Sequence, residues 1–148
     1  MGKVFFKKLI VAINGRESSI CAAMYSIMMA RTYNTELKFI YVIDTATIKY
    51  LSLNRFLVSS EAEDFSEKLK KDGEHYLNYV KMLAISKGIK AETEIRRGGV
   101  FTEVVKSADE FESDLIILGS ENKDIYENAH CPVLVVKDKD IEAKFKIF

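Results

Sequence analysis

The sequence predicts one α/β domain built on a doubly wound, five-stranded parallel sheet with helices on both faces, a Rossmann-like architecture. Two observations predict it: short apolar runs recur along the chain, and helical segments separate them. Such alternation gives a parallel sheet, because each crossover helix must pack on a face of the sheet. The length of 148 residues suits a single domain over 1–148, with 138–148 as a C-terminal tail.

Five segments are expected to form the strands. The first, 9–13, is a continuous apolar run that stops at the turn dipeptide Asn14-Gly15. The second, 37–43, is rich in β-branched and aromatic residues. In 91–95 apolar and charged residues alternate, which predicts a half-exposed strand at an edge of the sheet. Two further buried strands are expected over 115–118 and 133–136.

Helices are expected in the connections between these strands. Ser18 and Ser19 offer N-cap oxygens for a first helix that ends near residue 33. A long helix is expected over 61–87, with an apolar stripe formed by Phe65, Leu69, Tyr76, Val80 and Leu83. Gly73, in its middle, predicts a bend or close packing. Two shorter helices are expected over 101–111 and 122–129.

The composition argues against several classes of protein. Basic and acidic residues balance, 22 against 22, so the formal net charge is zero. A protein that coats nucleic acid or an anionic membrane would carry a positive excess, so neither partner is expected. The longest near-apolar stretch, 20–30, falls short of the ~18 residues that span a bilayer. Cys21 and Cys131 lack metal-type spacing and make a poor disulfide framework, so a cytoplasmic protein is expected.

In a parallel sheet of this kind, ligands bind beyond the carboxyl ends of the strands, at the point where the strand order reverses. The residues that follow the expected strands lie in 14–18, 42–44, 98–100 and 119–122. These four segments are the expected rim of any ligand site.

Five phrases, in this order, resemble the universal stress protein family. They read I-V-A-I-N-G-R-E-S-S at 10–19, Y-V-I-D at 41–44, R-G-G-V-F-T-E-V at 97–104, S-D-L-I-I-L-G-S at 113–120 and C-P-V-L-V-V at 131–136. Together they span about 7–137, nearly the whole chain. The resemblance implies a five-stranded α/β fold that is usually a homodimer, often paired through its last strands.

One branch of that family binds ATP. In it an Asp follows the first strand, the end of the second strand holds the adenine, and a G-x-x-G-x9-G-[S/T] loop after the fourth strand cradles the phosphates. A second branch lacks this loop. By resemblance, the candidate nucleotide-binding residues of this chain are Ile13, Asn14, Gly15, Arg16, Val42, Gly98, Leu118, Gly119 and Ser120.

This chain departs from the ATP-binding pattern at two places. Asn14 stands where the carboxylate is expected. Only residues 120–131 separate the Gly after the fourth strand from the Pro before the fifth, and a parallel crossover needs about a dozen residues for its helix. Glu121 and Asp124 would lie in the first turn of that helix and compete with phosphate. The chain is therefore expected to lack the loop, tight ATP binding and a resident cofactor.

The residues give little support for a catalytic or metal-binding function. ATP-pyrophosphatase-type enzymes carry an S-G-G-x-D-S loop after the first strand, and N-G-R-E-S-S at 14–19 lacks its second glycine. No metal site is expected, because His75 has no ligand partner three or four residues farther along its helix, and His130 and Cys131 point opposite ways in an extended segment. Lys90 with Arg96-Arg97 is expected to form a basic patch that blocks pairing at the sheet edge.

Two apolar segments are candidates for contact with a partner. The expected dimer contacts are Val133, Leu134, Val135 and Val136 of the last strand, with Phe145, Ile147 and Phe148 of the tail. The tail is expected to dock either on its own domain or on a dimer partner. The segment 45–60, which contains Tyr50, Leu51, Leu53, Phe56 and Leu57, fits a short helix or an ordered loop. It either caps the rim or contacts a partner.

The sequence therefore predicts a non-catalytic, cytoplasmic homodimer that regulates or protects through protein contacts in the stress response. The alternative is a weak sensor of an adenine nucleotide at the rim of the first and fourth strands. A short loop can meet one phosphate but not three, which favours AMP or a cyclic nucleotide over ATP. A nucleotide-hydrolysing enzyme of the ATP-pyrophosphatase type is the third hypothesis.

Overall fold

The sheet has the predicted architecture. The computed structural model describes residues 5–55 and 58–148. Five parallel strands lie in the order β3-β2-β1-β4-β5, which confirms the predicted fold class and the edge position of the third strand. The strands are β1 (Lys8–Ile13), β2 (Glu36–Asp44), β3 (Glu92–Gly98), β4 (Leu115–Leu118) and β5 (Val133–Val135).

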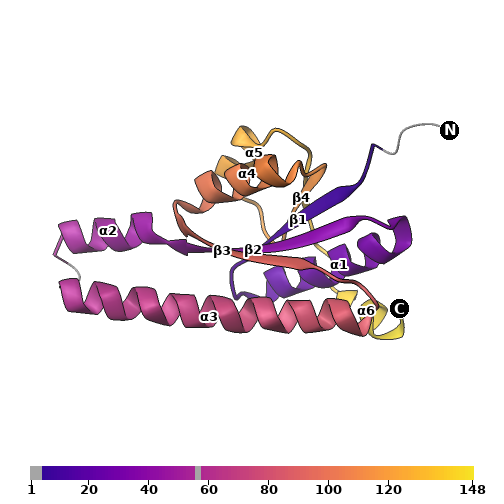
Figure 1. The fold of residues 1–148 in the computed structure, drawn as a ribbon, viewed down its shortest axis with the longest axis horizontal. Coiled ribbons are helices and arrows are strands. Elements are labelled where there is room, and N and C mark those ends of the chain that lie inside the picture. Colours follow the sequence, from indigo (N-terminus) through magenta and orange to yellow (C-terminus); the bar gives the residue numbers. More distant parts are fainter. Residues whose placement is uncertain (1–4, 56–57) are drawn as a thin grey trace.

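Helices cover both faces of this sheet (Figure 1). They are α1 (Glu17–Tyr33), α2 (Thr45–Leu53), α3 (Ser59–Ser86), α4 (Val100–Phe111), α5 (Lys123–Asn128) and α6 (Ile141–Ile147). Helices α1 and α3 pack on one face, and α4 and α5 pack on the other. Across the described residues, no helix is both long enough and apolar enough to cross a membrane.

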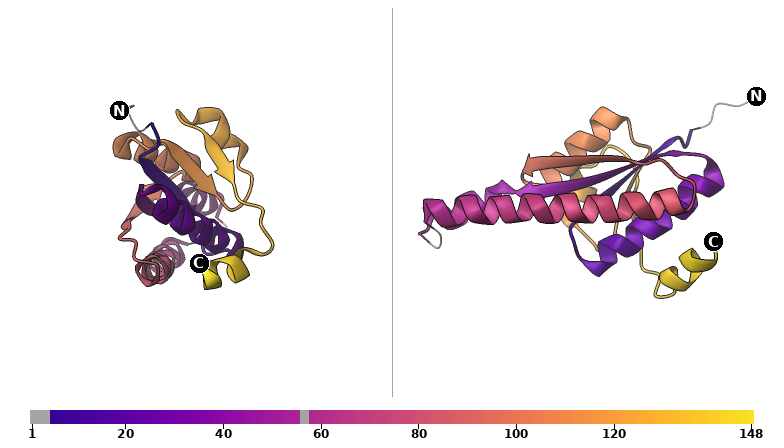
Figure 2. Two further views of the ribbon diagram at one scale, coloured as in Figure 1. Left: turned by 90° about the vertical axis from the view of Figure 1, so that its right-hand side faces the viewer. Right: turned by 60° about the horizontal axis from the view of Figure 1, so that its bottom comes forward.

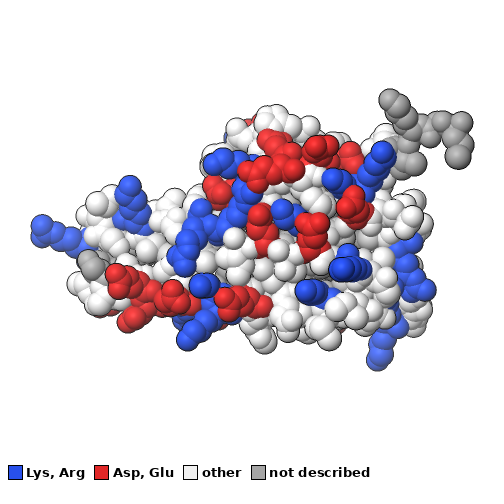
Figure 3. Space-filling model, in the orientation of Figure 1, with Lys and Arg blue, Asp and Glu red and all other residues white. Residues whose placement is uncertain are grey.

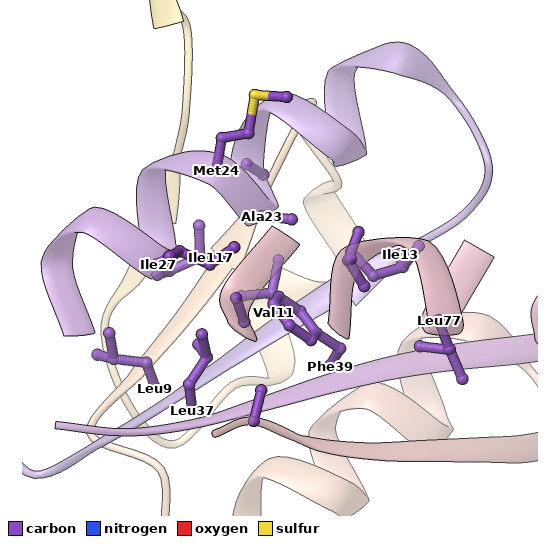
Figure 4. Packing of buried hydrophobic residues seen from close by; sticks show 14 of the residues in the cluster. Leu9, Val11, Ile13, Ala23, Met24, Ile27, Leu37, Phe39, Leu77 and Ile117 are labelled. Carbon is purple, nitrogen blue, oxygen red and sulfur yellow. The ribbon is translucent and has the colours of Figure 1, made fainter. Parts of the chain in front are cut away.

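The core has two layers because successive strand residues point to opposite faces of the sheet. On β1, Leu9 and Val11 face the α1 and α3 layer, while Ile10 faces the α4 layer. Figure 4 shows Leu9, Val11 and Phe39 meeting side chains of α1 and α3 in the larger layer. Residues buried on both faces explain why the central strands are continuous apolar runs rather than alternating ones.

The first helix begins earlier than its serines suggest. Arg16 is its N-cap and no side chain caps it, so the predicted capping role of Ser18 and Ser19 is wrong. The Ser19 hydroxyl instead donates to the Arg16 carbonyl over 2.8 Å and accepts from the Asn14 backbone N–H over 3.3 Å. Gly15, with φ of +81°, turns the chain sharply enough for the helix to begin at Glu17.

Helix α3 runs past the end of the sheet. Its N-terminal part projects beside α2, away from the strands (Figure 1). The prediction that the apolar stripe is buried is therefore wrong at Phe65, which is exposed. Farther along the helix, Leu77 and Val80 are buried under the sheet. Gly73 marks close packing rather than a bend, because a Cβ there would clash with the ring of Tyr41.

The C-terminal tail forms a helix and docks on its own domain. Helix α6 lies beside α1 (Figure 2), and its Ile141 and Phe145 are buried in the larger core layer. At its end, Arg31 donates to the Phe148 carbonyl over 3.2 Å, and its guanidinium lies 5.1 Å from the Phe148 ring centroid. Of the two docking modes expected for the tail, the structure has the intramolecular one.

The β3 edge carries an ion-pair network instead of the predicted basic patch. Arg96 lies between Glu94, Glu103 and Glu110, and Lys38 reaches Glu94 over 3.2 Å. Desolvation raises the pKa of Glu94, but hydrogen bonds from Ser107, Arg96 and Lys38 outweigh it, so the pKa of this carboxyl lies below its ordinary value. The edge is charged, as predicted, but Arg96 and Lys38 are paired with carboxylates instead of forming a basic patch.

Candidate functional site

A small cavity lies at the carboxyl ends of β1, β2 and β4, where the strand order reverses. Its volume is about 80 Å³. Six of the nine candidate nucleotide-binding residues line it: Ile13, Asn14, Val42, Leu118, Gly119 and Ser120. The remaining lining residues are Ala12, Ile40, Val100, Val104, Asn122 and Ile125. The cavity therefore sits at the location predicted for a ligand in this class of sheet.

Two of the missed residues come from α4. Val100, the last residue of the expected rim segment 98–100, begins the helix, and Val104 follows it by one helical turn. Their spacing puts both side chains on one face of α4, which is the face turned toward the sheet. The spacing could have indicated that both side chains face the sheet. Whether such side chains belong to the core or line a cavity depends on where the neighbouring helix packs.

The other three candidates do not line the cavity. Gly15 packs on the far side of the rim, where a Cβ would lie 2.6 Å from the ring of Tyr76 on α3. Arg16 is exposed. Gly98 has a φ of +146° and lies against the side chain of Glu103. Gly15 and Gly98 therefore allow the backbone to turn and the helices to pack closely, and they do not line the cavity.

Asn14 uses its side chain within its own turn. Its Oδ1 accepts a hydrogen bond from the Arg16 backbone N–H over 3.0 Å. This closes an Asx turn that steers the chain from β1 into α1. The amide oxygen that could replace the family's carboxylate is thus already bonded inside the loop.

Gly119 brings the end of β4 against the start of α1. A Cβ at this position would overlap the backbone carbonyl of Ser18. The backbone of the β4–α5 turn therefore lies directly on the first turn of α1, at the place where the family's ATP-binding branch has its glycine loop.

Helix α5 fills the short connection to β5, within one residue of the predicted 122–129 at each end. Asn122 caps it, with Oδ1 accepting from the Ile125 backbone N–H over 3.0 Å. Asp124 lies in the first turn as predicted, but Glu121 precedes the cap. Lys137 lies 2.9 Å from Glu121, and its hydrogen bond lowers the pKa of that carboxyl.

The candidate catalytic and metal-ligating side chains are scattered. Within the described ranges, no three His, Cys, Asp or Glu side chains gather as a metal site would require. His130 Nδ1 lies 2.9 Å from Asp109, on the exposed side of α4. Burial raises the pKa of the Cys131 thiol, and the charges of Asp109 and Asp114 raise it further. A thiol in such surroundings is a poor nucleophile.

The β5 edge is hollowed on both of its faces. One groove, of about 570 Å³, is mostly apolar, and it is lined by Leu118, Tyr126, Cys131, Pro132, Val133 and Val135 together with Glu121, Asn122 and Lys123. The other, of about 310 Å³, is lined by Tyr25, Leu134, Val135, Val136, Lys137 and Asp138. The strand residues expected to contact a dimer partner all lie along these grooves.

The three tail residues expected at the same contact have different surroundings. Phe145 is buried within its own domain, between α1 and the end of α3, with Lys87 Nζ 4.8 Å from its ring centroid. Phe148 is tied to Arg31. Ile147 is 87% exposed and faces away from the core.

Comparison with known proteins agrees with this geometry. Residues 5–137 match the universal stress protein family. The universal stress protein MJ0531 of Methanocaldococcus jannaschii is 32% identical over 92% of this chain and 85% of its own length. The crystal structure of a universal stress family protein from Burkholderia pseudomallei superposes with a TM-score of 0.77 over 93% of this chain and all of its own, at 16% identity.

A second similar structure is that of a universal stress protein in complex with cAMP. It has a TM-score of 0.67 and 18% identity, and the superposition covers 90% of this chain and 99% of the other. At such identity these superpositions establish the shared fold. The matched family, the curated relative and the strand order agree: this chain belongs to the universal stress protein family.

Proposed function

We propose that this chain acts as a homodimeric regulator or protectant in the stress response, through protein contacts and without catalysis. In this proposal two copies pair through strand β5. The two free cysteines, Cys21 and Cys131, fit a reducing compartment, and the proposed location is the cytoplasm.

One observation carries the proposal: β5 is an open edge with a groove on each face, and its own apolar side chains line both grooves. Its three residues bond to β4 on one side. The other side offers unpaired backbone groups, which attract a further strand. Val133 and Val135 point into one groove and Leu134 into the other, so a paired strand would cover apolar surface on both faces at once.

We also propose that the chain belongs to the branch without the glycine-rich phosphate loop. The short β4–β5 connection supports this, because α5 and its Asn122 cap use most of it. The contact of Gly119 with the Ser18 backbone supports it further, since it leaves no space for a wider loop.

The test of pairing is sedimentation velocity at low micromolar concentration. The wild-type chain is expected to be a dimer, and Val135→Lys is expected to be a folded monomer, because a charge would be buried in the paired edge. Thr93→Lys, an exposed position on the opposite edge strand, is the matched control and should stay dimeric. A monomeric wild-type chain, or a dimeric Val135→Lys, would contradict the proposal.

A second function is favoured by the rim cavity, namely weak binding of AMP or a cyclic nucleotide. Six candidate residues meet there, and a similar protein has been crystallised with cAMP. The volume of about 80 Å³ is well below the roughly 300–1,000 Å³ of typical ligand pockets, so only part of a nucleotide would be enclosed. Nucleotide hydrolysis is the least supported function, since Gly15 packs on Tyr76 and Arg16 is exposed.

Calorimetric titration of Mg-ATP, AMP and cAMP separates the two functions. Dissociation constants above roughly 1 mM, weaker than about 4 kcal/mol, would support the protein-contact proposal. AMP or cAMP binding near ~10 µM, about 7 kcal/mol, would favour the nucleotide sensor. Val100→Trp is the site control: Val100 is partly exposed where it lines the cavity, so the larger ring should fill it and abolish binding without unfolding the chain.

A further inference from the structure

A helical arm projects from the domain beyond the sheet. It consists of residues 45–55 and 58–69, so it contains α2 and the first part of α3, which run antiparallel to each other (Figure 1). Ile48 is buried, and Ala62 and Leu69 pack partly on the core, which fixes the two helices to each other and to the domain. Residues 56–57, which the sequence analysis included among the partner contacts, lie outside the described residues.

The arm exposes apolar side chains on both of its helices. On α2, Tyr50 is 61% exposed and Leu53 is 73% exposed, and their spacing of three puts them on one side of the helix. On the α3 side, Val58, which is the N-cap residue, and Phe65, in the second turn of the helix, are both exposed. Several exposed apolar side chains on one projecting arm indicate an interaction surface.

The arm also separates its charges by helix. Within the arm, the charged residues of 45–55 are Lys49 and Arg55, both basic, and those of 58–69 are the acidic Glu61, Glu63, Asp64 and Glu67, followed by Lys68. All seven are exposed. Figure 3 shows the acidic side chains gathered over the start of α3. Among the described residues, no ion pair joins the basic group to the acidic group.

We propose that this arm is a second self-association surface, on which the arm of another copy packs antiparallel to form a four-helix contact. A two-fold interface uses the same patch on both copies, so the patch must complement itself. The arm meets that condition, because the basic α2 of each copy would face the acidic start of the partner's α3. The apolar side chains would form the centre of the contact, and the charges its rim.

The charge distribution also separates this partner from others. Nucleic acid or an anionic membrane would be repelled by the carboxylates beside the exposed apolar groups. A second copy of the arm places basic residues opposite the acidic ones and acidic residues opposite the basic ones. The surface is short, so the contact is expected to be weaker than a standard interface of about 1,600 Å² and to appear only at high protein concentration.

The arm lies on the β2 and β3 side of the sheet, away from the β5 edge, so the two contacts do not compete. The proposal does not depend on the proposed function, because it can be tested in Val135→Lys chains, in which β5 pairing is blocked. Concentration-dependent dimers of that variant would be formed by the arms even if β5 were never an interface.

The experiment is a charge exchange in the Val135→Lys background, with sedimentation velocity up to about 300 µM, the range of a weak contact. An acidic-arm variant carries Lys49→Glu and Arg55→Glu, and a basic-arm variant carries Glu61→Lys and Asp64→Lys. Each alone is expected to self-associate at least about 10-fold more weakly than the parent, because like charges then face each other. An equimolar mixture should recover the parent affinity as a heterodimer, since each arm meets its opposite.

A fourth variant tests the apolar centre without touching the exchanged charges. Leu53→Asn replaces a side chain that is 73% exposed by a neutral polar one, so the fold should be retained and only self-association lost. Circular dichroism of each variant checks the fold. A parent that stays monomeric over the whole range would overturn the proposal. So would variants that associate as well as the parent, or a mixture that fails to recover.

Discussion

The two edges of the sheet have opposite surface chemistry. At β3, Arg96 contacts three carboxylates, and Lys38 joins them from the neighbouring strand. At β5, the side chains are valine and leucine, and they line a groove on each face of the strand. Natural sheets protect an edge with charge or with short length, because an unpaired strand recruits other strands. Here β3 is protected by charge, whereas β5 is protected only by its short length.

This difference bears on how the chain assembles. A partner strand at β3 would have to desolvate an ion network, which is costly even when the charges are paired. A partner strand at β5 would cover apolar side chains and cost far less. The asymmetry therefore directs pairing to one edge of a sheet whose two edges both have free backbone groups.

The largest expected effect lies at the rim next to β5. Gly119→Ala would force a Cβ into the Ser18 backbone, which cannot move without shifting α1, and is expected to cost about 3 kcal/mol of unfolding free energy. The matched control, Gly99→Ala on the β3 side, meets nothing closer than 3.5 Å and should cost less than about 1 kcal/mol. Urea unfolding measures both. Equal losses would mean that the close contact at Gly119 does not hold in solution.

The tail beside β5 gives the next largest effect. Phe145→Ala is expected to cost about 2 kcal/mol, less than a central core residue because α6 can partly collapse onto the space left. Ile147→Ala on the same helix should stay within about 0.5 kcal/mol, since Ile147 is exposed. Thermal unfolding should give the same Phe145→Ala loss at low and high protein concentration. A loss that grows with concentration would mean that the tail docks on a partner instead.

At the β3 edge, Arg96→Met is expected to cost about 1.5 kcal/mol near pH 7, because it leaves partly buried carboxylates without their cation. Arg97→Met, on the next residue of the strand, removes only an exposed hydrogen bond to Ser66 and should change little. Unfolding free energies in urea give both values.

The same network has a pH signature. Since the pKa of Glu94 is lowered in the folded chain, its stabilisation is complete above the ordinary glutamate pKa of about 4.3 and is lost as the pH falls through the lower folded value. Wild-type stability should therefore decline more steeply in this acidic window than that of Arg96→Met. If the stability of the two proteins declined equally with pH, the ion network would not be the cause of the decline.

The strands were predictable because apolar runs depend on local sequence, and the rim followed from the strands. Three kinds of feature did not follow. Gly15 could not be separated from a ligand-binding glycine, because its contact with Tyr76 joins distant parts of the chain. Phe65 fitted the apolar stripe of α3, but periodicity does not tell where the sheet ends.

The ion network at β3 was missed for a related reason. The sequence showed Arg96 beside Arg97, and adjacent strand residues point to opposite faces. Only Arg96 faces α4, whose Glu103 and Glu110 lie seven residues apart on one helix face. The pairing became visible only when α4 was known to cover that face of the sheet.

The smallest expected effect tests why the rim beside β5 should not bind ATP tightly. Glu121→Gln with Asp124→Asn removes both acidic groups near the start of α5, and Glu127→Gln, late in the same helix, is the matched control. If the short connection and the Gly119 contact exclude the triphosphate, removing charge adds no space, and the affinity for Mg-ATP should stay weaker than about 1 mM in calorimetry. Nanomolar binding by the double variant alone would mean that charge, and not loop length, separates this chain from the ATP-binding branch.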